Sequence, residues 1–507
     1  MAVLDALWFP IMAAYMLAIT FFLCVGLNLL FMTALAAWRR PRHPDPGPLD
    51  SYPRVTVQLP IFNELYVVER LVNASCALDW PRDRLEIQVL DDSTDETRFL
   101  VARLVRRWTE QGFNISHIRR LDREGFKAGA LEAGLAEAQG EFVAVFDADF
   151  VPPPGFLKGT IPYFRYERVG FVQARWGHLN QSYSLLTELQ SVIIDAHFFV
   201  DQVARNRGGF FMNFNGTAGV WRREAIIDAG GWEHDTLAED LDLSYRAQLR
   251  GWEAVYLPNL VVEAELPVTV SAYRAQQRRW AAGSLACAIK LLPKVMQAPI
   301  SVGVKLQAAL HLMGYGSHAC LLVMFLLQPF LLTYSARYSH QTTVAALSPF
   351  WLIVATVPAI APGIYLGYAQ WRANGRLTAR IPYIFGASVL GAGIMLTIVC
   401  ALARTLFGKP FAFERTPKYG IANHSDVWDG KRYALGVDPL LALEMLLACF
   451  SFGSLAYAVA LKSWSTFFYN GYFLLGLLFI IATSFVQLNV PAAPPVLASS
   501  APGNRDS

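Results

Sequence analysis

The chain has 507 residues, of which 54% are hydrophobic and only 16% are charged. Soluble proteins carry about 45–50% apolar and about 25% charged residues, so this composition argues against disorder, a collagen-like fibre or a purely soluble enzyme. The formal net charge of +3 gives no sign of a large basic surface, and we expect no nucleic-acid partner. The six cysteines include no CxxC pair, which argues against a zinc site or a disulfide framework.

The N-terminal segment is apolar. Residues 6–38 carry no charge, and this run is longer than the roughly 20 residues that cross a bilayer. Arg39, Arg40 and Arg42 follow it directly, and basic residues mark the cytoplasmic end of a span. We therefore expect residues 1–40 to form a transmembrane helix with its N-terminus outside, followed by a cytoplasmic domain.

The next stretch, residues 41–300, has the charge density of a soluble domain. Strands are predicted at 55–61, 86–90, 115–118 and 142–146, and helices from Glu64, at 96–111 and at 127–138. This alternation predicts an α/β domain with a doubly wound, mostly parallel sheet. In such a sheet the ligand lies beyond the carboxyl ends of the strands.

Two acidic clusters stand where predicted strands end. Asp91 and Asp92 follow one strand, and Asp147 and Asp149 follow another. Mg²⁺ and Mn²⁺ bind few protein carboxylates and complete their shell with phosphate oxygens, so the second pair suits a metal-bound diphosphate. A polar strand end would give the same pattern. The stretch 123–127, however, adds cations and backbone N–H groups near a helix start, where phosphate binds well.

Glu239 and Asp240 stand at the start of a predicted helix that ends at Gly251. The helix dipole favours acidic residues there, so capping alone accounts for them. The alternative is a general base, because an acceptor hydroxyl must lose its proton as a glycosidic bond forms.

A later helix, with Ser271 as its N-cap, places Gln276, Arg279 and Trp280 on one face. A guanidinium suits a diphosphate, and an indole suits the flat face of a sugar. A basic juxtamembrane helix with an interfacial tryptophan would carry the same residues.

Apolar runs return after this helix. They lie at 306–334, 348–369 and 381–403 within residues 301–404, and at 439–461 and 466–488 within a predicted transmembrane hairpin, residues 439–488. The tail 489–507 is rich in proline, alanine and serine and is expected to be disordered.

In chain order, these residues resemble the family 2 glycosyltransferases, which are inverting enzymes with a GT-A fold. The elements that match are Pro60–Glu64, Asp91–Asp92, Asp147–Asp149, Glu239–Asp240 and Gln276-x-x-Arg279-Trp280. The last element is typical of membrane-embedded polysaccharide synthases. Finer motifs at 89–95, 127–131, 172–176, 214–222 and 239–243 are similar to the cellulose synthase-like group, especially the plant glucomannan (β-1,4-mannan) synthases. Ala238 departs from the threonine that often precedes Glu-Asp in that group.

The resemblance implies a GT-A domain inserted between transmembrane helices and a role for each matching residue. On the donor side it assigns the nucleoside to Asp91 or Asp92, a place at the nucleotide pocket to Glu64, and the diphosphate to Lys127, Asp147 and Arg279, with Mg²⁺ or Mn²⁺ held by Asp147 and Asp149. It makes Asp240 the catalytic base. On the acceptor side it assigns Gln276, Trp280, Asn215, Gly216 and Thr217.

Residues 405–438 are rich in lysine and arginine, which favours the cytoplasm. Phe413, Thr416 and Lys418 in this stretch resemble the gating loop that closes over the nucleotide in cellulose synthases, with Arg415 where that motif has valine. A cytoplasmic gating loop requires an even number of crossings between the catalytic domain and the loop.

The run 381–403 would break this parity if it crossed the membrane. It is rich in glycine, alanine and serine, which suit close packing between helices. We therefore expect this run to lie along or dip into the cytoplasmic face, buried in protein. Five crossings then remain, and the C-terminus is cytoplasmic.

The sequence thus predicts an inverting, metal-dependent, processive membrane glycosyltransferase. Its partners would be a nucleotide sugar (GDP-mannose or UDP-glucose), a growing β-1,4-type glycan that it passes across the membrane, and the lipid bilayer. One alternative is a nonprocessive, glycolipid-forming enzyme similar to ceramide glucosyltransferase. Another is a catalytically silent sugar-binding or export protein. The expected location is the plasma (inner) membrane of a bacterium or the Golgi membrane of a eukaryote.

Overall fold

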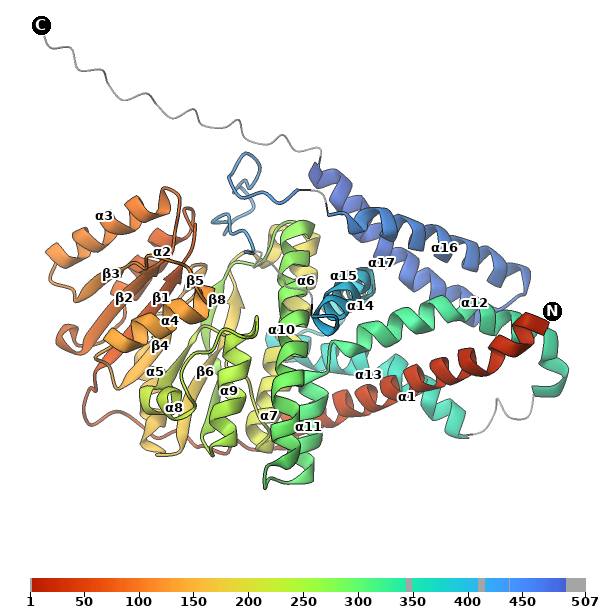
Figure 1. Ribbon diagram of the computed structural model, residues 1–507, viewed down its shortest axis with the longest axis horizontal. Helices are drawn as coiled ribbons and strands as arrows, with labels where there is room; N and C mark the ends of the chain where they lie inside the picture. The colour runs from red at the N-terminus through yellow and green to blue at the C-terminus, as the bar shows by residue number, and fades with distance from the viewer. Residues whose placement is uncertain (1, 343–348, 409–414, 437, 489–507) are drawn as a thin grey trace, which may run out of the picture.

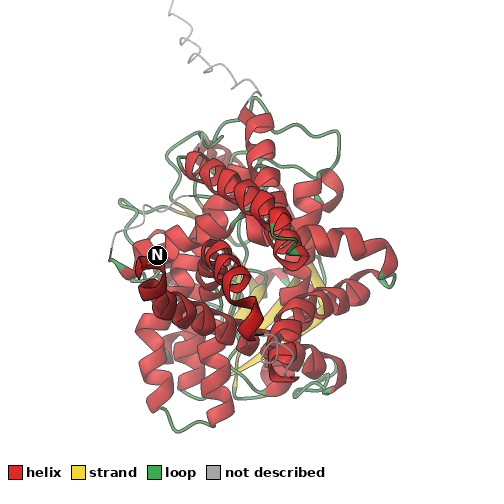
Figure 2. Cartoon of the chain, turned by 90° about the vertical axis from the view of Figure 1, so that its right-hand side faces the viewer, coloured by secondary structure: helices red, strands yellow, loops and turns green. Residues whose placement is uncertain are grey.

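The computed structural model describes residues 2–342, 349–408, 415–436 and 438–488. Figure 1 shows a domain built around a sheet at one end and a group of long helices at the other. In Figure 2, which views the molecule from the helical end, the strands lie behind the helices.

Within the described residues the sheet has eight strands in the order β3-β2-β1-β4-β7-β6-β8-β5. They are β1 (Val55–Ile61), β2 (Leu85–Asp91), β3 (Ile115–Ile118), β4 (Phe142–Val145), β5 (Phe150–Val151), β6 (Val169–His178), β7 (Gly219–Arg222) and β8 (Glu253–Ala264). The first four strands in this order are parallel, and β6 is parallel to β8. The strand β7 is antiparallel to both of its neighbours, and β5 is antiparallel to β8. The predicted α/β fold is confirmed, with a mixed second half to the sheet.

Helices cover both faces of the parallel half. α2 (Val68–Cys76) and α3 (Thr97–Glu110) share one hydrophobic cluster with the side chains of Val57 and Leu59. α4 (Phe126–Glu137) shares another with Val143 and Val145. Strands covered on both faces can have continuous apolar runs. β4 (FVAV) has such a run, whereas β1 (VTVQLPI) and β2 (LEIQVLD) carry polar residues at alternate positions.

The helix expected from Glu64 begins later, at Val68. Asn63 has a positive φ of 56°. The Glu64 carbonyl accepts hydrogen bonds from the N–H groups of Val67 (3.2 Å) and Val68 (3.1 Å). A turn therefore separates the end of β1 from α2, and Glu64 belongs to this turn.

The second half of the domain carries the helices α5 (Phe156–Thr160), α6 (Leu185–Ala196), α7 (Val203–Gly208), α8 (Arg223–Asp228), α9 (Glu239–Leu249) and α10 (Val270–Gln297). α9 occupies the stretch predicted for it. α10 begins before Ser271, because its N-cap is Thr269, whose side-chain oxygen accepts a hydrogen bond from the Ala272 N–H at 3.2 Å.

The remaining helices are α1 (Ala2–Trp38), α11 (Val302–Leu312), α12 (Gly316–Thr342), α13 (Pro349–Asn374), α14 (Ile381–Gly393), α15 (Met395–Leu406), α16 (Leu440–Ala460) and α17 (Trp464–Leu488). Four segments of the described chain are long and apolar enough to cross a membrane: Trp8–Trp38, Gly316–Arg337, Leu440–Ala460 and Trp464–Leu488. α14 and α15 make a fifth candidate only as one span bent by 42°. The run 306–334 is interrupted between α11 and α12.

The small residues of 381–403 permit a close helix crossing. A Cβ added at Gly393 would lie 2.4 Å from the Gly476 carbonyl oxygen, and one added at Gly476 would lie 2.5 Å from the Val389 carbonyl oxygen. α14 and α17 therefore touch backbone to backbone, a contact that larger side chains would prevent.

Candidate active site

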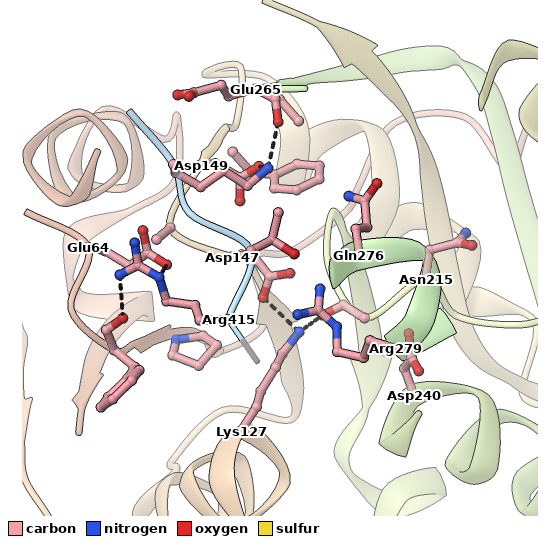
Figure 3. Close-up of a pocket in the computed structure, with 18 of the residues that line it drawn as sticks. Glu64, Lys127, Asp147, Asp149, Asn215, Asp240, Glu265, Gln276, Arg279 and Arg415 are labelled. Atoms are coloured by element: carbon pink, nitrogen blue, oxygen red, sulfur yellow. Dashed lines mark hydrogen bonds and ion pairs between the residues drawn. The ribbon is translucent and has the colours of Figure 1, made fainter. Parts of the chain in front are cut away.

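A cavity lies at the carboxyl ends of β1, β2, β4 and β8, next to α9, α10 and the segment 415–418 (Figure 3). Its walls include most of the predicted site residues: Glu64, Asp92, Lys127, Asp147, Asp149, Asn215, Gly216, Asp240, Gln276, Arg279, Trp280, Thr416 and Lys418. Strand ends gather at one edge of a parallel sheet, so these distant sequence segments meet there.

Asp147 is tied to its surroundings through both backbone and side chain. Its backbone N–H donates to the Thr217 hydroxyl at 2.8 Å, and its carboxylate lies 2.7 Å from the Lys127 ammonium. The same ammonium donates to the Gly216 carbonyl at 2.9 Å and lies 3.7 Å from the Glu239 carboxylate. Burial raises the pKa of Asp147 against the opposing effect of the Lys127 charge.

Asp149 meets a second ammonium. Its carboxylate lies 2.6 Å from the Lys418 nitrogen, which also donates to the Glu265 carbonyl at 2.6 Å. The Glu265 carboxylate accepts the N–H groups of Tyr419 (2.8 Å) and Gly420 (2.9 Å). The chain after Thr416 is thus fastened to the end of β8, beside Asp149.

The two carboxylates of Asp147 and Asp149 fit a divalent cation. Both come from one short segment, and both line the cavity. Their oxygens are the hard ligands that Mg²⁺ and Mn²⁺ prefer.

A second acidic cluster lies outside the cavity lining. It consists of Glu233, Asp235 and Asp242. The Lys290 ammonium lies 2.5, 2.7 and 2.9 Å from these carboxylates in turn. Lysine therefore balances this cluster, and its arrangement is that of an ion-pair network.

Asp240 occupies the first turn of α9. One of its carboxylate oxygens accepts the Leu241 N–H at 2.8 Å. A Cβ at Gly216, whose φ is +77°, would stand 2.9 Å from the other oxygen, so only glycine leaves this oxygen clear. Burial, followed by the repulsion of neighbouring Glu239, raises the pKa of Asp240 to about 7 despite the Lys127 charge. A carboxylate with such a pKa is a competent proton acceptor near neutral pH.

Two predicted residues do not line the cavity. The Asp91 side chain is buried and lies 2.8 Å from His117 Nε2. Thr217 is buried behind Asp147. Asp92 does reach the cavity, where Arg120 contacts its carboxylate at 2.5 Å. Phe413 lies outside the described residues.

Other lining residues were not predicted individually. Glu265, His178 and Trp176 all face the cavity, as does Arg123, which belongs to the cationic stretch 123–127 expected to bind phosphate. Arg415, noted in the sequence only as a departure from a motif, donates to the Phe62 carbonyl at 3.1 Å and lies 3.7 Å from Glu64.

Glu64 is buried beneath this arginine. Burial is the largest influence on it and raises its pKa to about 8. Glu265 directly follows β8, and a carboxylate at a strand end is a pattern that can mark a site residue in the sequence. Its partners Lys418, Tyr419 and Gly420, however, come from a loop far along the chain.

Comparison with known proteins agrees with this geometry. Residues 53–283 match the model of a family described as "Glycosyltransferase like family 2". A probable glucomannan 4-beta-mannosyltransferase 6 of Oryza sativa subsp. japonica is 46% identical over 253 residues, 49% of this chain and 44% of that protein. The glucomannan 4-beta-mannosyltransferase 2 of Arabidopsis thaliana is 47% identical over 238 residues, 46% of this chain and 45% of that protein.

The chain spans about half the length of the curated relatives it matches. Among solved structures, a mannosyltransferase from Pyrobaculum calidifontis in complex with GDP-Man and Mn²⁺ has a TM-score of 0.51. At 22% identity it covers 80% of this chain and 100% of its own, which is a likeness of fold. Residues 53–283 therefore match the glycosyltransferase family 2 model, and the fold of this domain is GT-A-like.

Proposed function

We propose that this chain is an inverting hexosyltransferase that uses a nucleotide sugar, with GDP-mannose as the favoured donor and UDP-glucose as its rival, to extend a β-1,4-type glycan. The observation that carries the proposal is the convergence of Asp147 and Asp149, Asp240, and the α10 side chains on one cavity. The names of the relatives at 46–47% identity favour mannose.

The proposed reaction is a single displacement at the anomeric carbon of the donor sugar. The acceptor hydroxyl oxygen forms a bond to the anomeric carbon while the bond from this carbon to the diphosphate oxygen breaks. The proton of the hydroxyl passes to the Asp240 carboxylate, and the nucleoside diphosphate leaves with the bonding electrons. Attack and departure on opposite faces of the sugar invert its configuration.

Lys127 and Arg279 line the cavity and offer cations to the diphosphate. A divalent cation held by Asp147 and Asp149, when bound, neutralises charge that builds up on the leaving group. The Trp280 indole, on the same wall as Arg279, offers a flat apolar face to the last sugar of the acceptor.

Membranes that contain the protein test this proposal. We expect radiolabel from GDP-mannose to enter an alkali-insoluble β-1,4-linked product that a β-mannanase releases, and membranes with Asp240→Asn to incorporate about 10²–10⁴-fold less label. Incorporation of label from UDP-glucose alone would show that glucose, and not mannose, is the transferred sugar. Label only in a lipid-soluble product would replace glycan extension with glycolipid formation.

We further propose that residues 415–436 lie on the same side of the membrane as the sheet domain, supported by contacts at both ends of the segment α14–α15. Before it, Gln370 donates to Asp195 at 2.9 Å, and Arg380 lies 3.1 Å from Glu188. After it, Lys418 contacts the end of β8. A segment that begins and ends against one domain need not cross, which agrees with the bend between α14 and α15.

Cysteine accessibility tests this arrangement. In a variant with the six native cysteines replaced, we expect a single cysteine at Thr416 to react with an impermeant maleimide only from the side of the catalytic domain. A single cysteine at Ser463, between α16 and α17, is the control and should react only from the opposite side. Labelling of both positions from one side would overturn the proposed placement of residues 415–436.

A further inference from the structure

We propose that the hairpin of α16 and α17 positions α10 through a buried ion-pair network, and so holds the cavity face of α10 in its reactive place. The network, named here the hairpin latch, consists of Arg274, Arg278, Asp438 and Glu444. This inference rests on the proposed function, because the residues that the latch would position are those assigned to the sugar chain and the diphosphate.

The latch joins parts of the chain that are far apart in sequence. The Arg274 guanidinium lies 2.5 Å from the Glu444 carboxylate and 3.6 Å from the Asp438 carboxylate. Arg278, one turn later on α10, contacts Asp438 as well. The side chains of Arg274 and Glu444 are 1% and 0% exposed, so the pair is removed from solvent.

Glu444 is the only charged residue in α16 and α17. An isolated charge in such an apolar hairpin is costly, and these charges are normally paired and linked to function. Replacing a buried ion pair by apolar side chains is often neutral for stability. Stability alone therefore does not explain the hairpin latch. Its geometry fits a role in holding α10 in place against α16.

α10 presents the latch and the cavity on opposite sides. Successive residues turn by about 100° around a helix. Arg274 and Arg278 therefore lie on one side of α10, whereas Gln276, Arg279 and Trp280 point roughly the opposite way, and it is these three that line the cavity. A shift of α10 away from the hairpin would move all three cavity residues together.

A second contact from the hairpin holds the start of α10. The Gln487 side chain of α17 accepts the Val270 N–H at 2.8 Å and donates to the Val268 carbonyl at 3.2 Å. Apolar side chains of α10, α15 and α17, among them Tyr273, Leu402 and Ile480, share one buried cluster behind this contact. The polar contacts of Gln487 thus hold the start of α10 in place, and the apolar cluster packs against the same part of the helix.

The test is a double replacement that removes both charges at once. Arg274→Met with Glu444→Leu leaves Arg278 paired with Asp438, so no buried charge is stranded. We expect the melting temperature to stay within a few degrees of the wild type. The rate of transfer per folded molecule should fall by at least about tenfold, since a 1 Å misplacement of reacting groups costs on the order of 10²-fold, and the products should be shorter.

Two further variants complete the design. The exchange Arg274→Glu with Glu444→Arg should recover part of the lost rate and product length. Ser451→Ala is the matched control, because it removes a buried hydrogen bond of 2.9 Å within the hairpin without touching α10, and it should keep the wild-type rate.

A double variant with wild-type rate and product length would overturn the proposal. So would a loss of rate that disappears when activity is expressed per folded molecule, because the latch would then be merely structural. If the wild-type protein transfers from neither donor, the proposed function fails instead, and this result is distinguishable from a failure of the latch.

Discussion

Asp240→Asn will leave the donor bound and reduce transfer by about 10²–10⁴-fold, the usual cost of losing a general base. The amide has nearly the same shape as the carboxylate and can still accept the Leu241 N–H, so the first turn of α9 should persist. It cannot accept the acceptor proton. Donor affinity from equilibrium binding and transfer from initial rates, measured on the same preparation, separate these two properties.

The pH dependence of the wild-type enzyme should also identify Asp240 as the general base. The pKa of Asp240 is raised to about 7, and only the ionised form accepts a proton. kcat/KM, which reports the free enzyme, should therefore rise as the pH passes upward through about 7 and level off above it. The residual activity of Asp240→Asn should lack this rise.

Glu239→Gln is the matched control for this prediction. Glu239 also lines the cavity and lies next to Asp240, but its contact is with the Lys127 ammonium. Its replacement should cost much less transfer than Asp240→Asn. A larger loss in Glu239→Gln, or weak donor binding with normal turnover in Asp240→Asn, would move the base away from Asp240.

The sequence is most informative where local pattern decides structure. The strands β1, β2 and β4 are rich in buried apolar residues, and acidic residues stand at the ends of β2 and β4, so the strands and these functional ends can both be predicted. The choice between Asp91 and Asp92 could not be made in this way. Adjacent residues at a strand end point in opposite directions, and Asp91 turns inward to His117 while Asp92 reaches the cavity.

Long-range pairing accounts for what the sequence did not reveal. Glu265 becomes part of the site because the short strand β5 pairs with the end of β8, and because the backbone at Tyr419 returns to its carboxylate. Arg274 and Glu444 are 170 positions apart. No local periodicity or residue spacing predicts either contact.

Asp149→Ala will abolish the metal dependence of donor binding. The substitution leaves Asp147 as the sole carboxylate of the pair, and Asp147 is already engaged by Lys127. Changes that only support a metal ligand cost about 10–100-fold in affinity, so loss of a ligand should weaken donor binding in the presence of Mn²⁺ by at least about 10²-fold. Excess EDTA should bring the wild type down to the same affinity and leave the variant unchanged.

Lys418→Met separates the loss of a metal ligand from the loss of an ion pair. Both substitutions break the 2.6 Å contact between Lys418 and Asp149, but only Asp149→Ala removes the carboxylate. With Lys418→Met, donor binding should therefore still respond to Mn²⁺ and to EDTA, whatever happens to the rate of transfer. If Lys418→Met loses the metal response while Asp149→Ala keeps it, the ion pair matters and the carboxylate is not a ligand. Full wild-type activity in excess EDTA would remove the metal from the mechanism, and Asp147 and Asp149 would then act only as partners of the two lysines.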